Sequence, residues 1–138
     1  MAADEDAYHE LCVYTLTHGD PAFIHQYVVD AYMAQHADAT TKPVGPAFAL
    51  VGLYLHVEKG FSGKQVQLAH MRLARRRRGW PAFALPADRG AMTARDVLAV
   101  PGGVERDRAI DDWCRSVWTA LSVHRQAIDD LLRENAIL

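Results

Sequence analysis

The apolar residues between positions 18 and 36 recur at helical spacing and leave only a narrow polar strip. The run Gly19-Asp20-Pro21 is typical of a helix start, because aspartate accepts hydrogen bonds from free amides and proline fits the first helical position. The pattern predicts a central helix that begins at Pro21 and buries its histidines at least in part. Taken at about 100° per residue, the segment has two apolar stripes and one polar strip. The first stripe comprises Phe23, Ile24, Tyr27, Val28, Ala31, Ala34 and Gln35, and the second comprises His25, Val29, Tyr32 and His36. The strip that faces water comprises Gln26, Asp30 and Met33.

Helices are also predicted on either side of this segment. Residues 6–18 have an apolar side and an acidic start, and Gly19 supplies a left-handed end. After a loop at 37–46, residues 46–59 are almost wholly apolar and are stopped by Gly60. A strand of that length would be unusual, so this segment favours a helix in the core.

The next part of the chain begins with a capping-box pattern, in which Ser62 is followed three residues later by Gln65. This pattern predicts a helix over residues 63–77. An ordered, packed loop is expected from Trp80 to Met92, because the segment combines prolines with large apolar residues. Thr93 is then suited to cap a short helix over residues 94–100.

Residues 104–138 contain no glycine or proline, and their apolar residues recur at alternating steps of four and three. The pattern fits one long helix or two helices with a bend near Ser122, and boundary rules do not separate the two. The sequence as a whole predicts an all-α, single-domain irregular helical bundle over residues 1–138, with four main helices and one short helix. The C-terminal seam comprises Ile110, Cys114, Val117, Leu121, His124, Ile128 and Leu131.

Composition narrows the function classes. The chain has 138 residues, of which 50% are hydrophobic and 23% are charged, with a formal net charge of −2. A chain of this size folds without a structural metal or disulfide, and its charge does not suggest nucleic-acid binding. Cys12 and Cys114 form no zinc-type spacing, which favours reduced thiols. The acidic N-terminus lacks signal-peptide features and no apolar run approaches a membrane span, so we expect a cytoplasmic protein with no required cofactor.

Three stretches of the chain together resemble a family of small helical bacterial proteins catalogued as a domain of unknown function. These stretches are AYHELCVYTLTHGDPAFIHQYVVDAYMAQHAD, LVGLYLHVEKGFSG and DWCRSVW, and the resemblance covers nearly the whole chain. Some members carry an additional cysteine-containing segment of the kind CPGCG before the first helix. This chain starts directly at that helix, so a zinc role of that segment does not transfer. The resemblance implies a helical bacterial protein and brings no established activity.

The seven histidines raise the question of whether any of them converge. If the central helix and the apolar helix after it form an antiparallel hairpin, His25 comes level with the neighbourhood of His56. His18 precedes the central helix at the same end, and Glu58 follows His56. Imidazoles and a carboxylate with an open position are what a catalytic or sensory divalent transition-metal site needs. The same histidines also suit a structural role, in which they bond buried carbonyls or tyrosine hydroxyls.

A second group lies toward the other end of the central helix and comprises Tyr32, Gln35, His36 and, in the following loop, Lys42. These residues suit a polar ligand pocket for a small anion, with Lys42 as the cation. They equally suit the commoner role of satisfying the end of a helix and holding its loop.

The run from Arg75 to Arg78, with Trp80 after it, suits phosphate neutralisation and base stacking. Cations at a helix C-terminus are also favoured by the helix dipole and are usually solvated there, so nucleic acid is not an expected partner. The sequence contains no serine-nucleophile elbow, phosphate loop, dinucleotide fingerprint or calcium loop. The common hydrolase, kinase and dehydrogenase classes therefore lack motif support.

The sequence leaves the function open between two classes. The first is a helical binding or interaction module that self-associates as a homodimer, because its helices offer more apolar face than a small bundle easily hides. The second is a metal-dependent enzyme or metal sensor centred on His25 and His56. The sequence identifies neither a substrate nor a ligand.

Overall fold

The computed structural model of the protein describes residues 2–76 and 78–138, and these residues form helices and connecting loops with no strand. The all-α fold class predicted from the sequence is therefore confirmed. The elements, in chain order, are α1 (Ala2–Thr17), α2 (His25–His36), α3 (Val44–Lys59), α4 (Gly63–Arg76), α5 (Ala94–Leu98), α6 (Val104–Leu121), the 3₁₀ turn η1 (Ser122–His124) and α7 (Arg125–Glu134).

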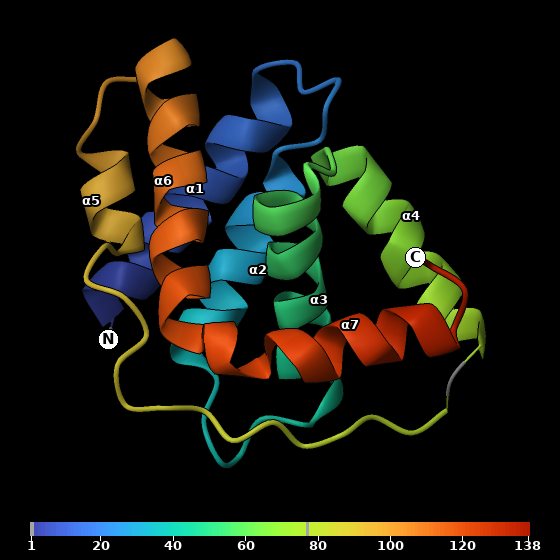
Figure 1. The fold of residues 1–138 in the computed structure, drawn as a ribbon. Coiled ribbons are helices and arrows are strands. Elements are labelled where there is room, and N and C mark those ends of the chain that lie inside the picture. Colours follow the sequence, from blue (N-terminus) through green and yellow to red (C-terminus); the bar gives the residue numbers. More distant parts are fainter. Residues whose placement is uncertain (1, 77) are drawn as a thin grey trace.

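Helices α2 and α3 pack side by side at the centre of the bundle (Figure 1). Helices α1, α5 and α6 gather on one side of this pair, α4 covers the other side, and α7 runs across the end of α3. Both central helices supply residues to one hydrophobic core. No helix in the described ranges is both long and apolar enough to cross a bilayer.

Helix α2 begins at His25, four residues later than the predicted start at Pro21. The backbone of Phe23 is left-handed, with φ 58°, which interrupts a right-handed helix at that point. Asp20 nevertheless accepts hydrogen bonds from the first amides, those of Ile24 at 2.7 Å and His25 at 3.0 Å. The prediction of a helix start at Pro21 is wrong, although the capping role expected of Asp20 is present.

The other predicted helix caps and helix ends that the structure describes are confirmed. Gly60 ends α3 in the left-handed conformation, with φ 72°. Ser62 and Gln65 form the capping box: the Gln65 amide donates to Ser62 Oγ at 3.2 Å, and the Ser62 amide donates to Gln65 Oε1 at 2.8 Å. Helix α4 continues to Arg76, and its predicted end at residue 77 lies outside the described residues. Thr93 caps α5 with a second capping box.

The C-terminal third forms two helices, because η1 separates α6 from α7 at Ser122. The seam predicted from the spacing is buried on both helices, for example at Val117 and Ile128. His124 lies within the bend, where its Nε2 donates to the carbonyl of Ala84 at 2.6 Å. The bend lets α7 turn away from α6 and pack against α3.

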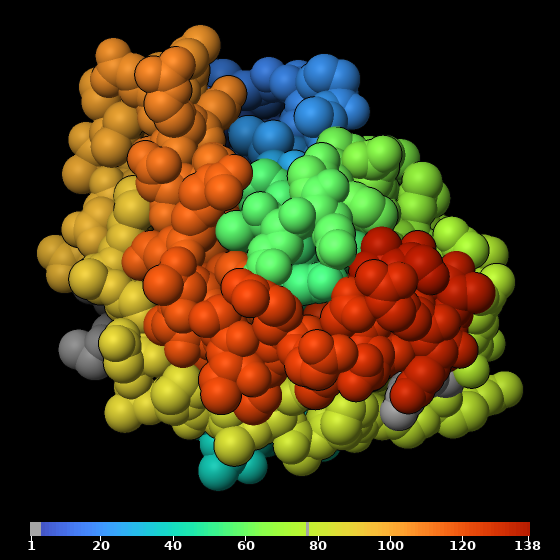
Figure 2. Space-filling view, viewed as in Figure 1, coloured from blue at the N-terminus to red at the C-terminus, as the bar shows by residue number. Residues whose placement is uncertain are grey.

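The segment after α4 runs along one edge of the molecule and packs against it, as the yellow surface in Figure 2 shows. Its apolar side chains Trp80, Phe83 and Leu85 are partly buried against the core. The predicted packed loop is confirmed.

Asp30 on α2 is 3% exposed, although its place on the polar strip predicts that it faces water. Its Oδ1 accepts a hydrogen bond from Gln26 Nε2 at 3.1 Å, whereas Oδ2 has no partner in the described part of the chain. Gly52 of α3 lies opposite, and a Cβ atom there would come within 1.8 Å of Oδ2. The prediction that Asp30 faces water is wrong, because α4 also packs on α2 and covers its polar strip. Burial raises the pKa of Asp30 well above its usual value.

We expect Asp30 to make the stability of the protein fall as pH rises. Because the pKa of Asp30 is raised in the folded chain, the folded state keeps a proton that the unfolded state loses above about pH 3.9. Between the unfolded and folded pKa values, the free energy of unfolding therefore decreases by up to about 1.4 kcal/mol per pH unit. Asp30→Asn should flatten this dependence and be the more stable protein above the folded pKa.

Urea unfolding at several pH values between about 5 and 8 measures this difference. Asp112→Asn, at an exposed position of α6, is the matched control and should keep the wild-type pH dependence. Identical pH dependence in Asp30→Asn and the wild type would contradict the assignment.

Candidate functional site

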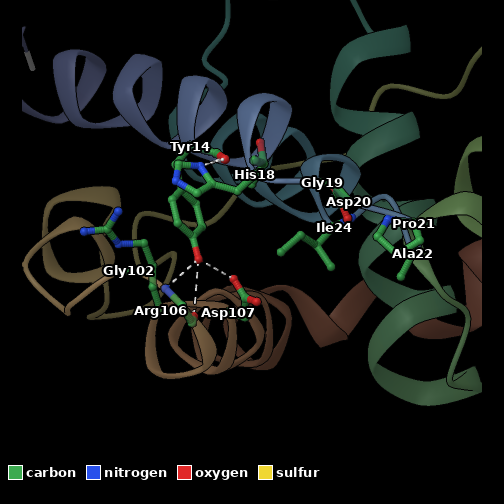
Figure 3. A pocket seen from close by; sticks show the side chains of 12 residues that line it. Tyr14, His18, Gly19, Asp20, Pro21, Ala22, Ile24, Gly102, Arg106 and Asp107 are labelled. Carbon is green, nitrogen blue, oxygen red and sulfur yellow. Dashed lines mark hydrogen bonds between the residues drawn. The ribbon is translucent and has the colours of Figure 1, made fainter.

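A pocket of about 640 Å³ opens between the C-terminal end of α1, the loop that leads to α2, and the N-terminus of α6. We call it the His18 pocket (Figure 3). Its polar lining residues are Tyr14, Thr15, His18, Asp20, Arg106 and Asp107. The site thus joins residues that are about ninety positions apart in the sequence.

Tyr14 ties α1 to the start of α6. Its hydroxyl donates to Asp107 Oδ1 at 2.7 Å and accepts from the Gly103 amide at 2.9 Å. The guanidinium of Arg106 lies over the Tyr14 ring, 4.7 Å from the ring centroid, an arrangement that favours a cation. Burial, followed by the hydrogen bond to Asp107, raises the pKa of Tyr14, which therefore remains a neutral phenol.

Arg106 is also fixed by backbone carbonyls. Its Nε donates to the carbonyl of Val100 at 2.9 Å, and a terminal nitrogen donates to the carbonyl of Leu98 at 3.1 Å. These carbonyls end α5, so the guanidinium satisfies groups that the short helix leaves open. The positive charge of the pocket is therefore held in place by the backbone.

His18 presents one ring nitrogen without a described partner. Its Nδ1 lies 2.8 Å from the carbonyl oxygen of Tyr14, and since a carbonyl only accepts, Nδ1 must carry the proton. In the neutral ring, Nε2 then carries the lone pair. The side chain is exposed and its ring lies beside the Tyr14 ring (Figure 3), with centroids 4.9 Å apart and the two planes tilted by 34°. Nε2 is thus free to accept a hydrogen bond or a proton.

The loop that carries His18 into α2 is anchored on the start of α4. The amide of Lys64 donates to the carbonyl of Ala22 at 2.9 Å. Gly63 lies so close to this loop that a Cβ atom there would come within 1.8 Å of the Phe23 carbonyl oxygen. The left-handed turn at Phe23 and the absence of a side chain at residue 63 therefore shape one wall of the pocket together.

The structure does not bring together the four residues considered for a metal site. His18 lies in the pocket, whereas His25 Nδ1 bonds Thr15 Oγ1 at 2.9 Å. Glu58 accepts hydrogen bonds from the indole of Trp118 and the guanidinium of Arg125, and His56 has other partners. Among the residues that the structure describes, no group of three or more histidine, cysteine, aspartate or glutamate side chains is placed to hold a metal ion.

The hairpin prediction gave the correct pair of helices but the wrong facing residue. Tyr27, not His25, faces His56, and their rings stack with centroids 3.7 Å apart. His25 turns toward α1 instead, where burial lowers its pKa.

His56 holds the end of α3 against α6. Its Nε2 lies 2.6 Å from Asp111 Oδ1, and its Nδ1 lies 3.3 Å from the carbonyl oxygen of Phe61. Both partners are acceptors, so the ring donates from whichever nitrogen carries the proton. Burial raises the pKa of Asp111, but hydrogen bonds from Arg115 and His56 outweigh burial and hold that pKa below its usual value. This contact between α3 and α6 braces the fold outside the pocket.

The residues predicted to form a ligand pocket at the end of the central helix also bond to separate partners. The Tyr32 ring stacks between those of Tyr8 and His36, and His36 Nε2 contacts Asp4 Oδ2 at 2.5 Å. Gln35 donates to the carbonyl of Met92 at 2.7 Å and accepts from the indole of Trp113 at 3.1 Å. These contacts hold α2 against α1, α6 and the loop before α5.

A pocket of about 460 Å³ is lined by Gln35 and His36, but Lys42 is not among its lining residues. Arg89 supplies the cation there. Its guanidinium donates to the carbonyls of Gln35 and Ala37, which end α2. No local sequence pattern indicates Arg89, because this contact spans more than fifty residues.

The arginines at the end of α4 contact the C-terminal segment. Arg72 donates to the carbonyl of Ala136 at 3.2 Å, and Arg76 donates to the carbonyl of Asn135. The third residue of the arginine run, at position 77, lies outside the described residues. Part of this basic cluster therefore satisfies backbone carbonyls after α7.

Replacing Gly63 with alanine should destabilise the protein and disturb the pocket wall. The added methyl group would overlap the Phe23 carbonyl, and overpacking of this kind costs about 1–3 kcal/mol. Urea unfolding gives the loss of stability, and amide NMR shifts of residues 19–24 report the displaced loop. Gly79→Ala is the control, because a Cβ atom there meets nothing within 4 Å; equal stability of the two variants would contradict the proposed anchoring.

Comparison with known proteins identifies a family but no activity. No curated protein and no solved structure matches the chain. Residues 5–122 match a family described as a family of unknown function (DUF5946), and this range contains every residue that lines the His18 pocket. The chain therefore belongs to this family of unknown function.

Proposed function

We propose that the protein is a helical module that binds a small molecule in the His18 pocket. The pocket volume of about 640 Å³ falls within the range of about 300–1,000 Å³ that is usual for small-molecule sites. The observation that carries the proposal is Nε2 of His18, which has no partner among the described residues and is held as an acceptor by the bond between Nδ1 and Tyr14. A preorganised acceptor at the edge of a cavity is a feature that a ligand can use.

The groups around the pocket suggest the chemistry of the ligand. Asp20 accepts from helix amides, one oxygen of Asp107 accepts from Tyr14, and Arg106 is held by carbonyls and the Tyr14 ring. His18 Nε2 and the second oxygen of Asp107 are therefore acceptors that a ligand can use. We expect a polar ligand with an N–H or O–H donor directed at Nε2 and a planar part that lies against the neighbouring rings of His18 and Tyr14.

A screen by amide NMR tests this proposal, with a fragment library of polyols, amino alcohols and nitrogen heterocycles. The wild type should bind at least one fragment, with shift changes at residues 14–24 and 102–107. His18→Ala should weaken that binding roughly tenfold, since one hydrogen bond is lost. His9→Ala, an exposed histidine of α1 outside the pocket, should bind like the wild type. Fragment binding that is unchanged in His18→Ala would contradict the proposal.

Self-association is the second candidate, and α1 supplies its support. Val13 and Leu16 lie three residues apart on this helix and are 61% and 63% exposed. Residues at this spacing share a helix face, so they form a small apolar stripe toward solvent. Light scattering after size exclusion should detect a dimer at micromolar concentration and a monomer for Leu16→Lys. A wild type that stays monomeric would rule out the homodimer.

The hypothesis of a metal site has less support, because the four residues considered as ligands bond to separate partners. Elemental analysis of purified, untagged protein separates it from the binding module. A stoichiometric transition metal would favour the metal hypothesis over the module proposed here.

A further inference from the structure

Helix α4 carries a second exposed apolar pair. Leu68 and Met71 lie three residues apart on this helix and are 47% and 44% exposed. A cation follows on the same side of the helix at each end of the pair, because the successive steps are four, three and four residues. We call this surface the α4 face, and its exposed residues are Lys64, Leu68, Met71 and Arg75.

The exposed side of α1 has the opposite charge at a similar spacing. Its apolar pair lies toward the C-terminal end of the helix, and two acidic residues precede the pair at steps of four and three. We call this surface the α1 face, and its exposed residues are Asp6, Glu10, Val13 and Leu16.

The charges of the two faces are open to a partner. Asp6, Glu10 and Arg75 take part in no ion pair among the described residues. The neighbouring Arg72 and Arg76 donate to neutral backbone carbonyls, so their positive charge adds to that of Arg75. Each face therefore combines an apolar pair with unbalanced charge, which is negative on α1 and positive on α4.

The two faces match in register when the helices run antiparallel. Leu16 of one copy can be set level with Leu68 of another. Val13 and Met71 then also lie level, because each is three residues, or about 4.5 Å, further along in the same direction. In this register the glutamate of the α1 face lies within one residue of the arginine of the α4 face. Apolar groups therefore meet apolar groups, and acids meet bases.

The two faces of one copy cannot meet each other. Helices α1 and α4 lie on opposite sides of the central pair of helices (Figure 1). A contact between the faces thus joins two different copies and leaves one free face of each kind on the resulting pair. Contacts of this head-to-tail type continue to further copies.

We propose that the α4 face binds the α1 face of a second copy of this chain. The proposal rests on the self-association considered above and adds the surface that α1 meets. Burial of the apolar pairs favours the contact, and the opposite charges fix the antiparallel direction. Contact of α1 with α1 is disfavoured, because it sets acids against acids or against apolar residues. The faces are small, so the contact is weak.

Mixing two variants tests the proposal by light scattering after size exclusion. Leu16→Lys blocks the α1 face and leaves the α4 face intact, whereas Met71→Glu does the reverse. Both positions are exposed, so the fold is kept. The wild type should form dimers and then larger species as its concentration rises from micromolar to millimolar. Each variant alone should stay monomeric, and an equimolar mixture should form a one-to-one dimer through the two intact faces.

Charge reversal tests the register. Glu10→Arg and Arg75→Glu should each weaken association about two- to fivefold, since an exposed attractive pair becomes a repulsive one. Both changes in one chain should restore association, because the charges are then exchanged between the faces. Arg108→Glu, at an exposed position of α6, is the control and should associate like the wild type.

The possible failures are distinguishable. A wild type that stays monomeric at every concentration would overturn this proposal together with self-association itself. Association of Met71→Glu as strong as that of the wild type, with Leu16→Lys monomeric, would overturn this proposal alone and leave a symmetric dimer through α1. A mixture no heavier than its components, or no rescue in the double charge variant, would also overturn it.

Discussion

The contact between Asp30 of α2 and Gly52 of α3 is the constraint on which the bundle depends. These two helices form the centre of the molecule, and α1, α4 and α6 also pack on α2. A helix covered on so many sides has to bury part of its polar strip. The carboxyl of Asp30 fits because residue 52 has no side chain and because burial raises the pKa of Asp30, so that the group folds as a neutral acid. A charged carboxylate at this contact would carry a large desolvation cost.

This central contact sets the positions of two pockets. With α2 fixed against α3, the chain before α2 must turn sharply at Phe23, and the start of α4 at Gly63 holds that turn. The turn places the loop after His18 beside the N-terminus of α6 and so forms the His18 pocket. On the side of α2 that faces α4, the same packing leaves Asp30 at the lining of a smaller pocket of about 210 Å³.

Features of the fold that depend on neighbouring residues could be predicted from the sequence. Gly60, the Ser62–Gln65 pair and Thr93 end or cap helices through contacts within a few residues, and all three behave as expected. The start of α2 could not be predicted, because the left-handed turn at Phe23 is held by α4, about forty residues later in the chain. Proline at residue 21 is compatible with either arrangement.

The candidate site was less predictable than the fold. His18 was selected from the sequence, but Tyr14, Arg106 and Asp107 were not, since their contacts join segments that no local pattern connects. Asp30 was predicted on the wrong side of α2, because periodicity shows which residues share a face but not how many neighbours cover the helix. His25 and His56 lie in the expected pair of helices, yet a rotation of α2 brings Tyr27 to His56 in place of His25.

The protonation state of Asp30 is the most direct test of the proposed packing of α2 against α3. Carbon-13 NMR of the aspartate carboxyl groups, recorded as a function of pH, reports each ionisation separately. The structure predicts that the Asp30 carbon keeps the shift of a carboxylic acid at pH values above about 3.9, the ordinary pKa of an aspartate. If the carbon of Asp30 instead titrates near that ordinary pKa, the buried neutral acid between α2 and α3 is contradicted, and with it the physical basis of the packing described for the bundle.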